Sequence, residues 1–280
     1  MGSRPIGTLF AGRYRVDALL AEGGAAVVYR GTDLERGDEV AIKELRQEFG
    51  RDEEIRRRFR REASILRALR HDAIVRILDD GDDDGVLYVV MELLHGCSLR
   101  EELESVRCIT PATWCEWLHS IGEALDEAHA QGIVHGDLKP ENCFLERLPN
   151  GERRIKLLDF GMAKILGLDR LTRTGEVAGT PLYMAPELIL GSSDVDGRTD
   201  VYALGVMTFE ALTGQRPFTE RQPARLLAQI VGGDSRSMEN VGANVSPNVE
   251  RSVARAMGTV RDRRFASASE FAAELARALD

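Results

Sequence analysis

The chain has 280 residues, of which 43% are hydrophobic, so it can bury a substantial core in one large domain or in two lobes. Its 37 lysines and arginines against 46 aspartates and glutamates leave a net charge of -9, which argues against a nucleic-acid-binding surface. The four cysteines lack Cys-x-x-Cys spacing, and no signal-peptide core or bilayer-length apolar run is found. These features predict a cytoplasmic protein with no metal-thiolate cluster and no membrane span.

The first ninety residues are predicted to be mainly β-structure. Alternating or β-rich stretches predict strands over 14–20, 27–31, 40–45, 74–78 and 86–91. One helix is predicted between the third and fourth strands, over about 52–69, because apolar residues recur there at helical spacing. These residues are Ile55, Phe59, Leu66 and Leu69.

Glu62 lies on the apolar face of this helix, where a carboxylate is costly to bury alone. It therefore needs a cationic partner, and Lys43, at the end of the sequence Val-Ala-Ile-Lys, is the natural candidate. The alternative is that Glu62 lies at the edge of the apolar stripe and is solvated. The arginines between 56 and 61 are interpreted as the solvated face of the helix and not as a binding patch.

After Met91 the pattern becomes helical almost throughout. Thr110 followed by Pro111 predicts an N-cap with proline at the first helical position, opening a helix that ends near 131–132. Further helices are predicted over 200–212, 223–230, 248–257 and 268–279. A β-rich part joined to a helical part near 92–96 predicts two lobes, with the cleft between them as the default ligand site.

Four polar residues of the second half point to phosphoryl transfer. Residues 135–142 read His-Gly-Asp-Leu-Lys-Pro-Glu-Asn, and Asp-Phe-Gly follows at 159–161. Asn142 and Asp159 offer the hard oxygen ligands that Mg²⁺ prefers, and Lys139 offers a cation. Asp137 remains to orient an attacking hydroxyl. Each triplet alone is equally typical of a turn, but together and in this order they predict a phosphotransferase.

These motifs resemble the catalytic and metal-binding loops of the protein kinases, and the resemblance covers about 14–279. The sequences at 58–62 (Arg-Phe-Arg-Arg-Glu) and 202–205 (Tyr-Ala-Leu-Gly) are similar to the bacterial branch of the eukaryotic-like serine/threonine kinases. The implied fold is α+β and bilobal, with an N-terminal extension over 1–12 and a kinase domain over 13–280. Within that domain, a β-rich N-lobe with one main helix covers about 13–92, a hinge 92–96 and a mostly helical C-lobe 97–280.

The resemblance implies a reaction between ATP, held with Mg²⁺ or with Mn²⁺ as a substitute, and a serine or threonine hydroxyl of a protein, including the chain itself. Asp137 would orient the hydroxyl and accept its proton, while Lys139 would offset the charge on the transferring phosphate. The segment 179–187, Gly-Thr-Pro-Leu-Tyr-Met-Ala-Pro-Glu, would seat the acceptor peptide. Thr180, within this segment, would orient Asp137 and Lys139. Asn142 and Asp159 would hold the metal.

The resemblance also implies a nucleotide site. Lys43, paired with Glu62, would grip the phosphates, Met91 would close the back of the adenine pocket, and backbone groups of Glu92 and Leu94 would bind the adenine edge. Val28, Ala41 and Phe144 would sandwich the ring. The full set of implied nucleotide-binding residues is Leu20, Ala21, Glu22, Gly23, Gly24, Ala25, Ala26, Val27, Val28, Ala41, Lys43, Met91, Glu92, Leu94 and Phe144.

The chain departs from the family pattern at three positions. Ala21 and Ala26 replace the outer glycines of the hairpin and should restrict its positive φ angles and close approach to phosphates. Gly136 replaces an arginine that normally pairs with a phosphorylated activation segment, so phosphorylation of Thr172 or Thr174 should not be strictly required for activity. Lys164 would be a remaining counter-charge.

The resemblance also implies two structural roles, and two alternative functions remain open. Glu187 should pair with Arg264, and Asp200 should brace the catalytic loop through backbone donors. The departures leave open a pseudokinase that acts as a nucleotide-sensing or scaffolding binding module. A small-molecule phosphotransferase is the other alternative, although such enzymes lack the 179–187 segment. The protein substrate, the oligomeric state and any continuation beyond Asp280 are not predicted.

Overall fold

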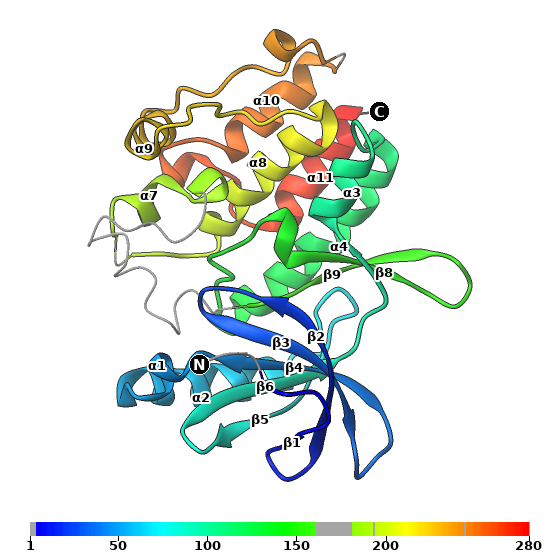
Figure 1. The fold of residues 1–280 in the computed structure, drawn as a ribbon. Helices are drawn as coiled ribbons and strands as arrows, with labels where there is room; N and C mark the ends of the chain where they lie inside the picture. The colour runs from blue at the N-terminus through cyan, green and yellow to red at the C-terminus, as the bar shows by residue number, and fades with distance from the viewer. Residues whose placement is uncertain (1–3, 161–180, 193, 244, 280) are drawn as a thin grey trace. The chain divides into compact units, whose positions relative to one another are not determined.

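The computed structural model describes residues 4–160, 181–192, 194–243 and 245–279 (Figure 1). It divides into two compact units, Met1–His95 and Gly96–Asp280. The first unit is built on a β-sheet and the second is mostly helical, which confirms the predicted α+β class and its two-part plan.

The first unit contains a six-stranded antiparallel sheet. In spatial order its strands are β1 (Leu9–Phe10), β2 (Tyr14–Glu22), β3 (Ala26–Asp33), β4 (Glu39–Leu45), β6 (Val86–Glu92) and β5 (Ile77–Asp83). The prediction for β5 was wrong in position, because this strand runs through an acidic stretch and not through the apolar residues before it. As an edge strand, β5 carries charges that pair with arginines, for example Asp80 with Arg67 at 3.2 Å.

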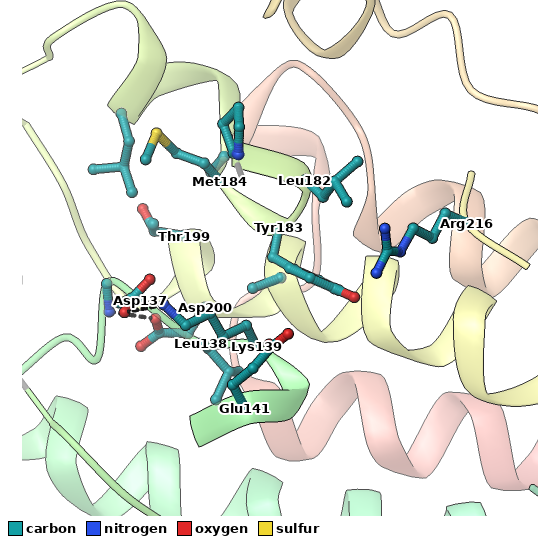
Figure 2. Close-up of a pocket in the computed structure, with 15 residues that line it drawn as sticks. Asp137, Leu138, Lys139, Glu141, Leu182, Tyr183, Met184, Thr199, Asp200 and Arg216 are labelled. Carbon is teal, nitrogen blue, oxygen red and sulfur yellow. Dashed lines mark hydrogen bonds and ion pairs between the residues drawn. The ribbon is translucent and has the colours of Figure 1, made fainter. Parts of the chain in front are cut away.

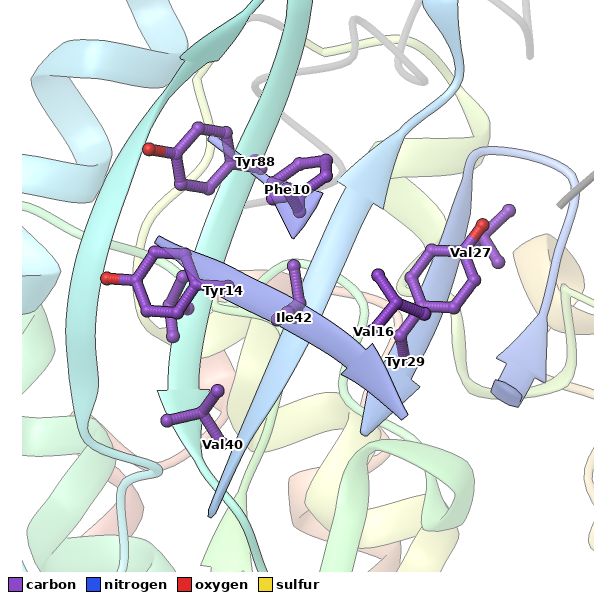
Figure 3. Close-up of a cluster of buried hydrophobic side chains, with 9 residues drawn as sticks. Phe10, Tyr14, Val16, Val27, Tyr29, Val40, Ile42 and Tyr88 are labelled. Atoms are coloured by element: carbon purple, nitrogen blue, oxygen red, sulfur yellow. The ribbon is translucent and has the colours of Figure 1, made fainter. Parts of the chain in front are cut away.

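A cluster of aromatic and β-branched residues packs on one face of this sheet (Figure 3). Phe10, which no pattern predicted as a strand residue, is fully buried there and meets the Tyr88 ring edge-on at 4.9 Å. The Tyr14 hydroxyl donates to Asp79 Oδ2 at 2.7 Å, so this buried ring keeps a polar partner. Part of the segment predicted as an extension therefore lies in the core of the first unit.

Two helices follow β4. These are the short α1 (Gln47–Gly50), which was not predicted, and α2 (Glu53–Ala68), which confirms the predicted helix. The Asp52 side chain caps α2 by accepting hydrogen bonds from the backbone of Glu54 and Ile55. Phe59 and Leu66 are buried as predicted, and Arg57 on another face of the helix is exposed.

The second unit combines a small antiparallel sheet with helices (Figure 1). The sheet contains β7 (Gly96–Ser98), β8 (Cys143–Arg147) and β9 (Arg153–Leu157). The described helices are α3 (Leu99–Ser105), α4 (Pro111–Ala130), α7 (Pro186–Ile189), α8 (Arg198–Thr213), α9 (Pro223–Gly232), α10 (Pro247–Ala256) and α11 (Ala268–Leu279). Every residue of α8 from Thr199 to Leu212 is buried, because α4, α10 and α11 all pack against it.

The predicted helix ends agree with the structure. The Thr110 hydroxyl accepts from the Thr113 backbone N–H at 3.3 Å, and Pro111 takes the first helical position of α4. Gly214 ends α8 in the left-handed conformation, with φ 67°. Among the helices of the described ranges, none is long and apolar enough to cross a membrane.

Candidate active site

The loop before β8 brings three of the predicted residues together. Lys139 Nζ donates to Asp137 Oδ2 at 2.7 Å, and Asn142 Nδ2 donates to the same oxygen at 3.1 Å. Asn142 Nδ2 also donates to the backbone oxygen of Asp137 at 2.7 Å, because a 3₁₀ turn over Pro140–Asn142 folds its side chain back over the loop. The carboxylate is thus held by a cation and an amide while 42% of its side chain stays exposed.

Asp159 lies in a second loop that is joined to this one. The backbone N–H of Leu158 donates to the Asn142 carbonyl at 2.8 Å. His135 is fully buried, and its Nε2 contacts the Leu158 carbonyl oxygen at 2.8 Å. Because a carbonyl only accepts, Nε2 carries the proton, while Nδ1 accepts from the Asp137 N–H at 3.4 Å. His135 therefore links the two loops through both of its ring nitrogens.

The backbone of Asp159 has φ 59°, a left-handed conformation that is uncommon for a residue other than glycine. Such strain persists only where the surrounding structure holds it, and it is enriched at functional sites. The Phe160 ring packs on His135 with a centroid distance of 4.7 Å and is buried. This packing fixes the residue that follows Asp159 and so helps to hold the carboxylate in place.

Asp200, at the start of α8, confirms its predicted role as a brace. One carboxylate oxygen accepts from the His135 N–H and the other from the Gly136 N–H, both at 2.9 Å. Gly136 has φ 73°, a conformation that glycine adopts without the strain of a side chain. His129 Nε2, which no sequence pattern singled out, also contacts Asp200 Oδ2 at 2.7 Å.

The environment keeps Asp200 ionised. Burial raises the pKa of this carboxyl, but the hydrogen bond and charge of His129, together with the backbone donors, outweigh burial and lower the pKa below its ordinary value. Burial alone would lower the pKa of His129. The hydrogen bond to Asp200 outweighs burial, so the His129 pKa is raised above its ordinary value. The pair therefore favours an imidazolium beside a carboxylate under the catalytic loop.

The predicted pair of Glu187 and Arg264 is also confirmed. The Arg264 guanidinium donates to both carboxylate oxygens at 2.7 Å, and the Thr199 hydroxyl adds a third bond at 2.9 Å. Arg264 is fully buried and Glu187 is 12% exposed. Burial raises the Glu187 pKa, but the bonds from Arg264 outweigh this and lower the pKa below its usual value.

This pair predicts a loss of stability in acid. Because the folded-state pKa of Glu187 is lowered, the pair stabilises the fold above the ordinary glutamate pKa and loses that contribution as pH falls through the folded pKa. We expect Glu187→Gln to lower the free energy of unfolding by about 3 kcal/mol near pH 7, because Arg264 is left buried without its charge partner. In denaturant titrations, the difference in free energy of unfolding between the variant and the wild type should shrink below about pH 4.3. A constant difference down to about pH 3 would contradict this.

A pocket of about 260 Å³ opens beside Asp137 and Lys139. Its wall also includes Tyr183 and Met184, from the segment predicted to seat the acceptor peptide (Figure 2). Thr180 lies outside the described residues, as do Thr172, Thr174 and Lys164, so the predictions on these residues stay predictions.

A buried polar network beside this pocket was not predicted. The Arg100 guanidinium donates to Glu210 at 2.9 Å and to Glu141 at 3.0 Å, and it also donates to the Tyr183 hydroxyl. Tyr183 in turn donates to Glu210. The sequence carried one local signal, the Ser98-x-x-Glu101 capping box that opens α3 next to Arg100.

In the first unit, strand register places four predicted nucleotide residues on one face of the sheet. Lys43 is paired with Val28 on one neighbouring strand, Ala41 is paired with Met91 on the other, and side chains alternate along β4. Lys43 is only 9% exposed. The backbone N–H of Glu92 already donates to the Arg76 carbonyl at 3.0 Å, so this N–H is not available as a donor to the adenine edge.

Two expectations about the hairpin need correction. Val27 belongs to the buried core cluster, so its side chain lies on the sheet face opposite to Val28 and only its backbone is left to contact a nucleotide. Ala21 lies within β2 and Ala26 within β3, and neither has a positive φ. The argument that alanine restricts positive φ here was therefore wrong, because neither position needs it.

The other predicted residues of the hairpin are accessible. Leu20, Glu22, Gly23 and Gly24 are exposed, and Ala25 is partly exposed. Glu62 is also partly exposed on α2, and its pairing with Lys43 stays a prediction. Leu94 follows β6 in the first unit, whereas Phe144 lies on β8 in the second. The nucleotide site as a whole draws on both units, so it also stays a prediction.

Comparisons with known proteins agree with these features. The family model described as the protein kinase domain matches residues 14–275. The chain is 38% identical to the serine/threonine-protein kinase PknJ of Mycobacterium tuberculosis, over 98% of this chain and 46% of PknJ. It is 34% identical to the serine/threonine-protein kinase PrkC of Bacillus subtilis, over 98% of this chain and 42% of PrkC. The chain thus spans less than half the length of these two relatives.

The fold is similar to a solved structure as well. The crystal structure of the PknI kinase domain of Mycobacterium tuberculosis matches with a TM-score of 0.78. The identity is 28%, and the match covers 98% of both chains.

Proposed function

Because this chain belongs to the protein kinase family, we propose that it transfers the γ-phosphoryl group of ATP to a serine or threonine hydroxyl of a protein, including its own. The observation that carries the proposal is the arrangement around Asp137. One of its oxygens accepts from Lys139 and Asn142, while Oδ1 has no hydrogen-bond partner among the residues that the structure describes. A carboxylate that has 42% of its side chain exposed and lies beside a pocket is suited to accept from a substrate hydroxyl.

Asn142 and Asp159 fit a divalent metal. Asn142 is 7% exposed, and its Nδ2 donates both of its recorded bonds to Asp137, which turns its carbonyl oxygen Oδ1 away from them. Two protein oxygens suffice for Mg²⁺, since that ion keeps waters and takes further ligands from nucleotide phosphates. We propose Mg²⁺ as the resident ion and Mn²⁺ as a substitute. When bound, the metal would neutralise charge on the phosphates.

The protein side chains then have separate tasks. Asp137 orients the acceptor hydroxyl and takes its proton as the oxygen attacks the γ-phosphorus. Lys139, whose ammonium is held 2.7 Å from Asp137, offsets negative charge on the transferring group. Lys43 holds the nucleotide phosphates under the control of Glu62. The pocket wall at 181–185 seats the residues that flank the acceptor, which favours a peptide over a small-molecule acceptor.

A labelled-ATP assay tests the proposal. We expect the wild-type chain to label itself and a generic protein substrate, and we expect Lys43→Met to lower this rate by about 10²- to 10³-fold, because methionine keeps the length but loses the charge on the phosphates. Arg36→Met is the matched control, since it removes a positive charge from the exposed turn between β3 and β4. It should keep near-wild-type activity.

The possible outcomes separate an enzyme from a scaffold. Labelling that survives Lys43→Met would contradict the role of Lys43. No labelling by the wild type with either Mg²⁺ or Mn²⁺ would contradict the proposed reaction. In that case a thermal shift with Mg-ATP distinguishes a nucleotide-sensing module, which is stabilised, from a scaffold that binds no nucleotide.

A further inference from the structure

Arg216 is a charged residue of the acceptor pocket that the proposed reaction does not use. It follows Gly214, which ends α8, and it lines the same pocket as Asp137 and Lys139. Figure 2 shows it beyond Tyr183, at the end of the pocket away from Asp137. Its side chain is 45% exposed, so its guanidinium is accessible to a bound peptide.

The carboxylate nearest to Arg216 is already occupied. Glu210 is 8% exposed, and its Oε1 accepts from Arg100 at 2.9 Å and from Arg216 Nε at 3.3 Å. Its Oε2 accepts from the Tyr183 hydroxyl and from Arg100 at 3.3 Å. Burial raises the Glu210 pKa, but the bonds from Arg100 and Tyr183 outweigh it and lower the pKa, so the carboxylate is ionised and satisfied. Glu210 therefore has little capacity left for Arg216.

The guanidinium of Arg216 therefore has hydrogen-bond donors that its contact with Glu210 does not occupy. Its only recorded side-chain hydrogen bond within the described ranges is the 3.3 Å contact through Nε, which leaves its two terminal nitrogens to solvent. The backbone of Arg216 is anchored separately, because Arg236 donates to its carbonyl oxygen at 2.6 Å. The charge of Glu141, an exposed carboxylate of this wall, is offset by the partly buried Arg100 at 3.0 Å. This end of the pocket is therefore suited to an anion.

We propose that Arg216 binds a carboxylate side chain that flanks the acceptor serine or threonine, so that the kinase prefers substrates with an aspartate or glutamate near the acceptor. The two terminal nitrogens form a planar fork that matches a carboxylate. The proposal rests on the proposed function, because it assigns the substrate class of the same site. A basic side chain at this place would face the guanidinium of Arg216.

A peptide series tests this on the whole chain. The parent is a neutral peptide with a single threonine, and glutamate or lysine is placed at each flanking position in turn. We expect one position at which glutamate gives a kcat/KM about tenfold higher than lysine. Arg216→Gln should reduce this ratio to about one, and Arg216→Glu should invert it, since the sign of the charge at this position is reversed. Arg277→Gln, which removes an exposed arginine on α11, should keep the wild-type ratio.

The outcomes are distinct. Phosphorylation of the neutral peptide with equal rates for all charged versions overturns the preference and leaves the proposed kinase activity intact. A glutamate preference that persists unchanged in Arg216→Gln overturns the assignment to Arg216. Failure to phosphorylate any peptide or protein overturns the proposed function and this inference together. Because the ratio of two peptides is measured on one enzyme sample, a partial loss of folded protein in a variant does not affect it.

Discussion

Replacing Asp137 by asparagine is expected to lower kcat for peptide phosphorylation by roughly 10²- to 10⁴-fold, the usual contribution of a positioned proton acceptor. The KM for ATP should change little, because Asp137 is assigned to the acceptor and not to the nucleotide. Measurement of kcat and both KM values with radiolabelled ATP checks this expectation.

The size of the effect depends on which of the two terminal atoms of the residue 137 side chain accepts a hydrogen bond and which donates one. In the wild type, Oδ2 accepts from Lys139 Nζ at 2.7 Å and from Asn142 Nδ2 at 3.1 Å. Asparagine has one acceptor oxygen, and that oxygen must stay beside these two donors, because an amide NH₂ there would face an ammonium. The NH₂ group would then point toward the substrate, where it donates a hydrogen bond and cannot accept the proton of a hydroxyl.

Glu141→Gln is the matched control for Asp137→Asn. Glu141 is an exposed carboxylate of the same loop and lines the same pocket, but its recorded side-chain bond is to Arg100 and not to Lys139. We expect its kcat to stay within about tenfold of the wild type, as for a partly exposed ion pair. If Asp137→Asn were no slower than Glu141→Gln, Asp137 would not be the proton acceptor.

Replacing Asp200 by asparagine is expected to destabilise the second unit by about 3 kcal/mol, because a buried group that holds three donors loses its charge and one acceptor oxygen. Asp200 is 1% exposed and accepts from the backbone of His135 and Gly136 and from His129. Denaturant unfolding of the variant and the wild type measures this difference.

The same change should also slow the reaction. The two backbone bonds of Asp200 fix the residues directly before Asp137, so their loss lets the catalytic carboxylate shift. We expect a fall in kcat of about tenfold to a hundredfold, a range typical of a lost positioning group. His129→Gln is the comparison, since it removes the imidazolium but leaves both backbone bonds. If it reduces kcat as much as Asp200→Asn does, the charge pair and not the brace supports catalysis.

Local sequence signals predicted the helices well, because their causes are local. The Thr110-Pro111 pair and Gly214 act on their own turns, and the apolar stripe of α2 needs only helical spacing to be visible. The short strands β1, β7, β8 and β9 carried no comparable signal. Each of them forms because a neighbouring strand supplies hydrogen bonds, and that neighbour can lie far away in the sequence.

The hairpin shows where motif matching alone misleads. The pattern assigned Val27 and Val28 together to the nucleotide site, but adjacent strand residues face opposite sides of a sheet. The pairing of Val28 with Lys43 decided which of the two shares a face with the lysine, and Val27 went to the core. Period-two alternation was visible in the sequence, but the register that assigns the faces was not.

By itself, the amino-acid sequence determined the family, the helix ends and the residue types needed for phosphoryl transfer, since each of these depends on residue identity and near neighbours. Tertiary structure alone decided which groups Asp200 braces, how Glu210 is shared by Arg100 and Tyr183, and that Arg216 reaches the acceptor pocket. These contacts join segments up to 110 positions apart. They depend on the packing of helices and loops, which no local pattern encodes.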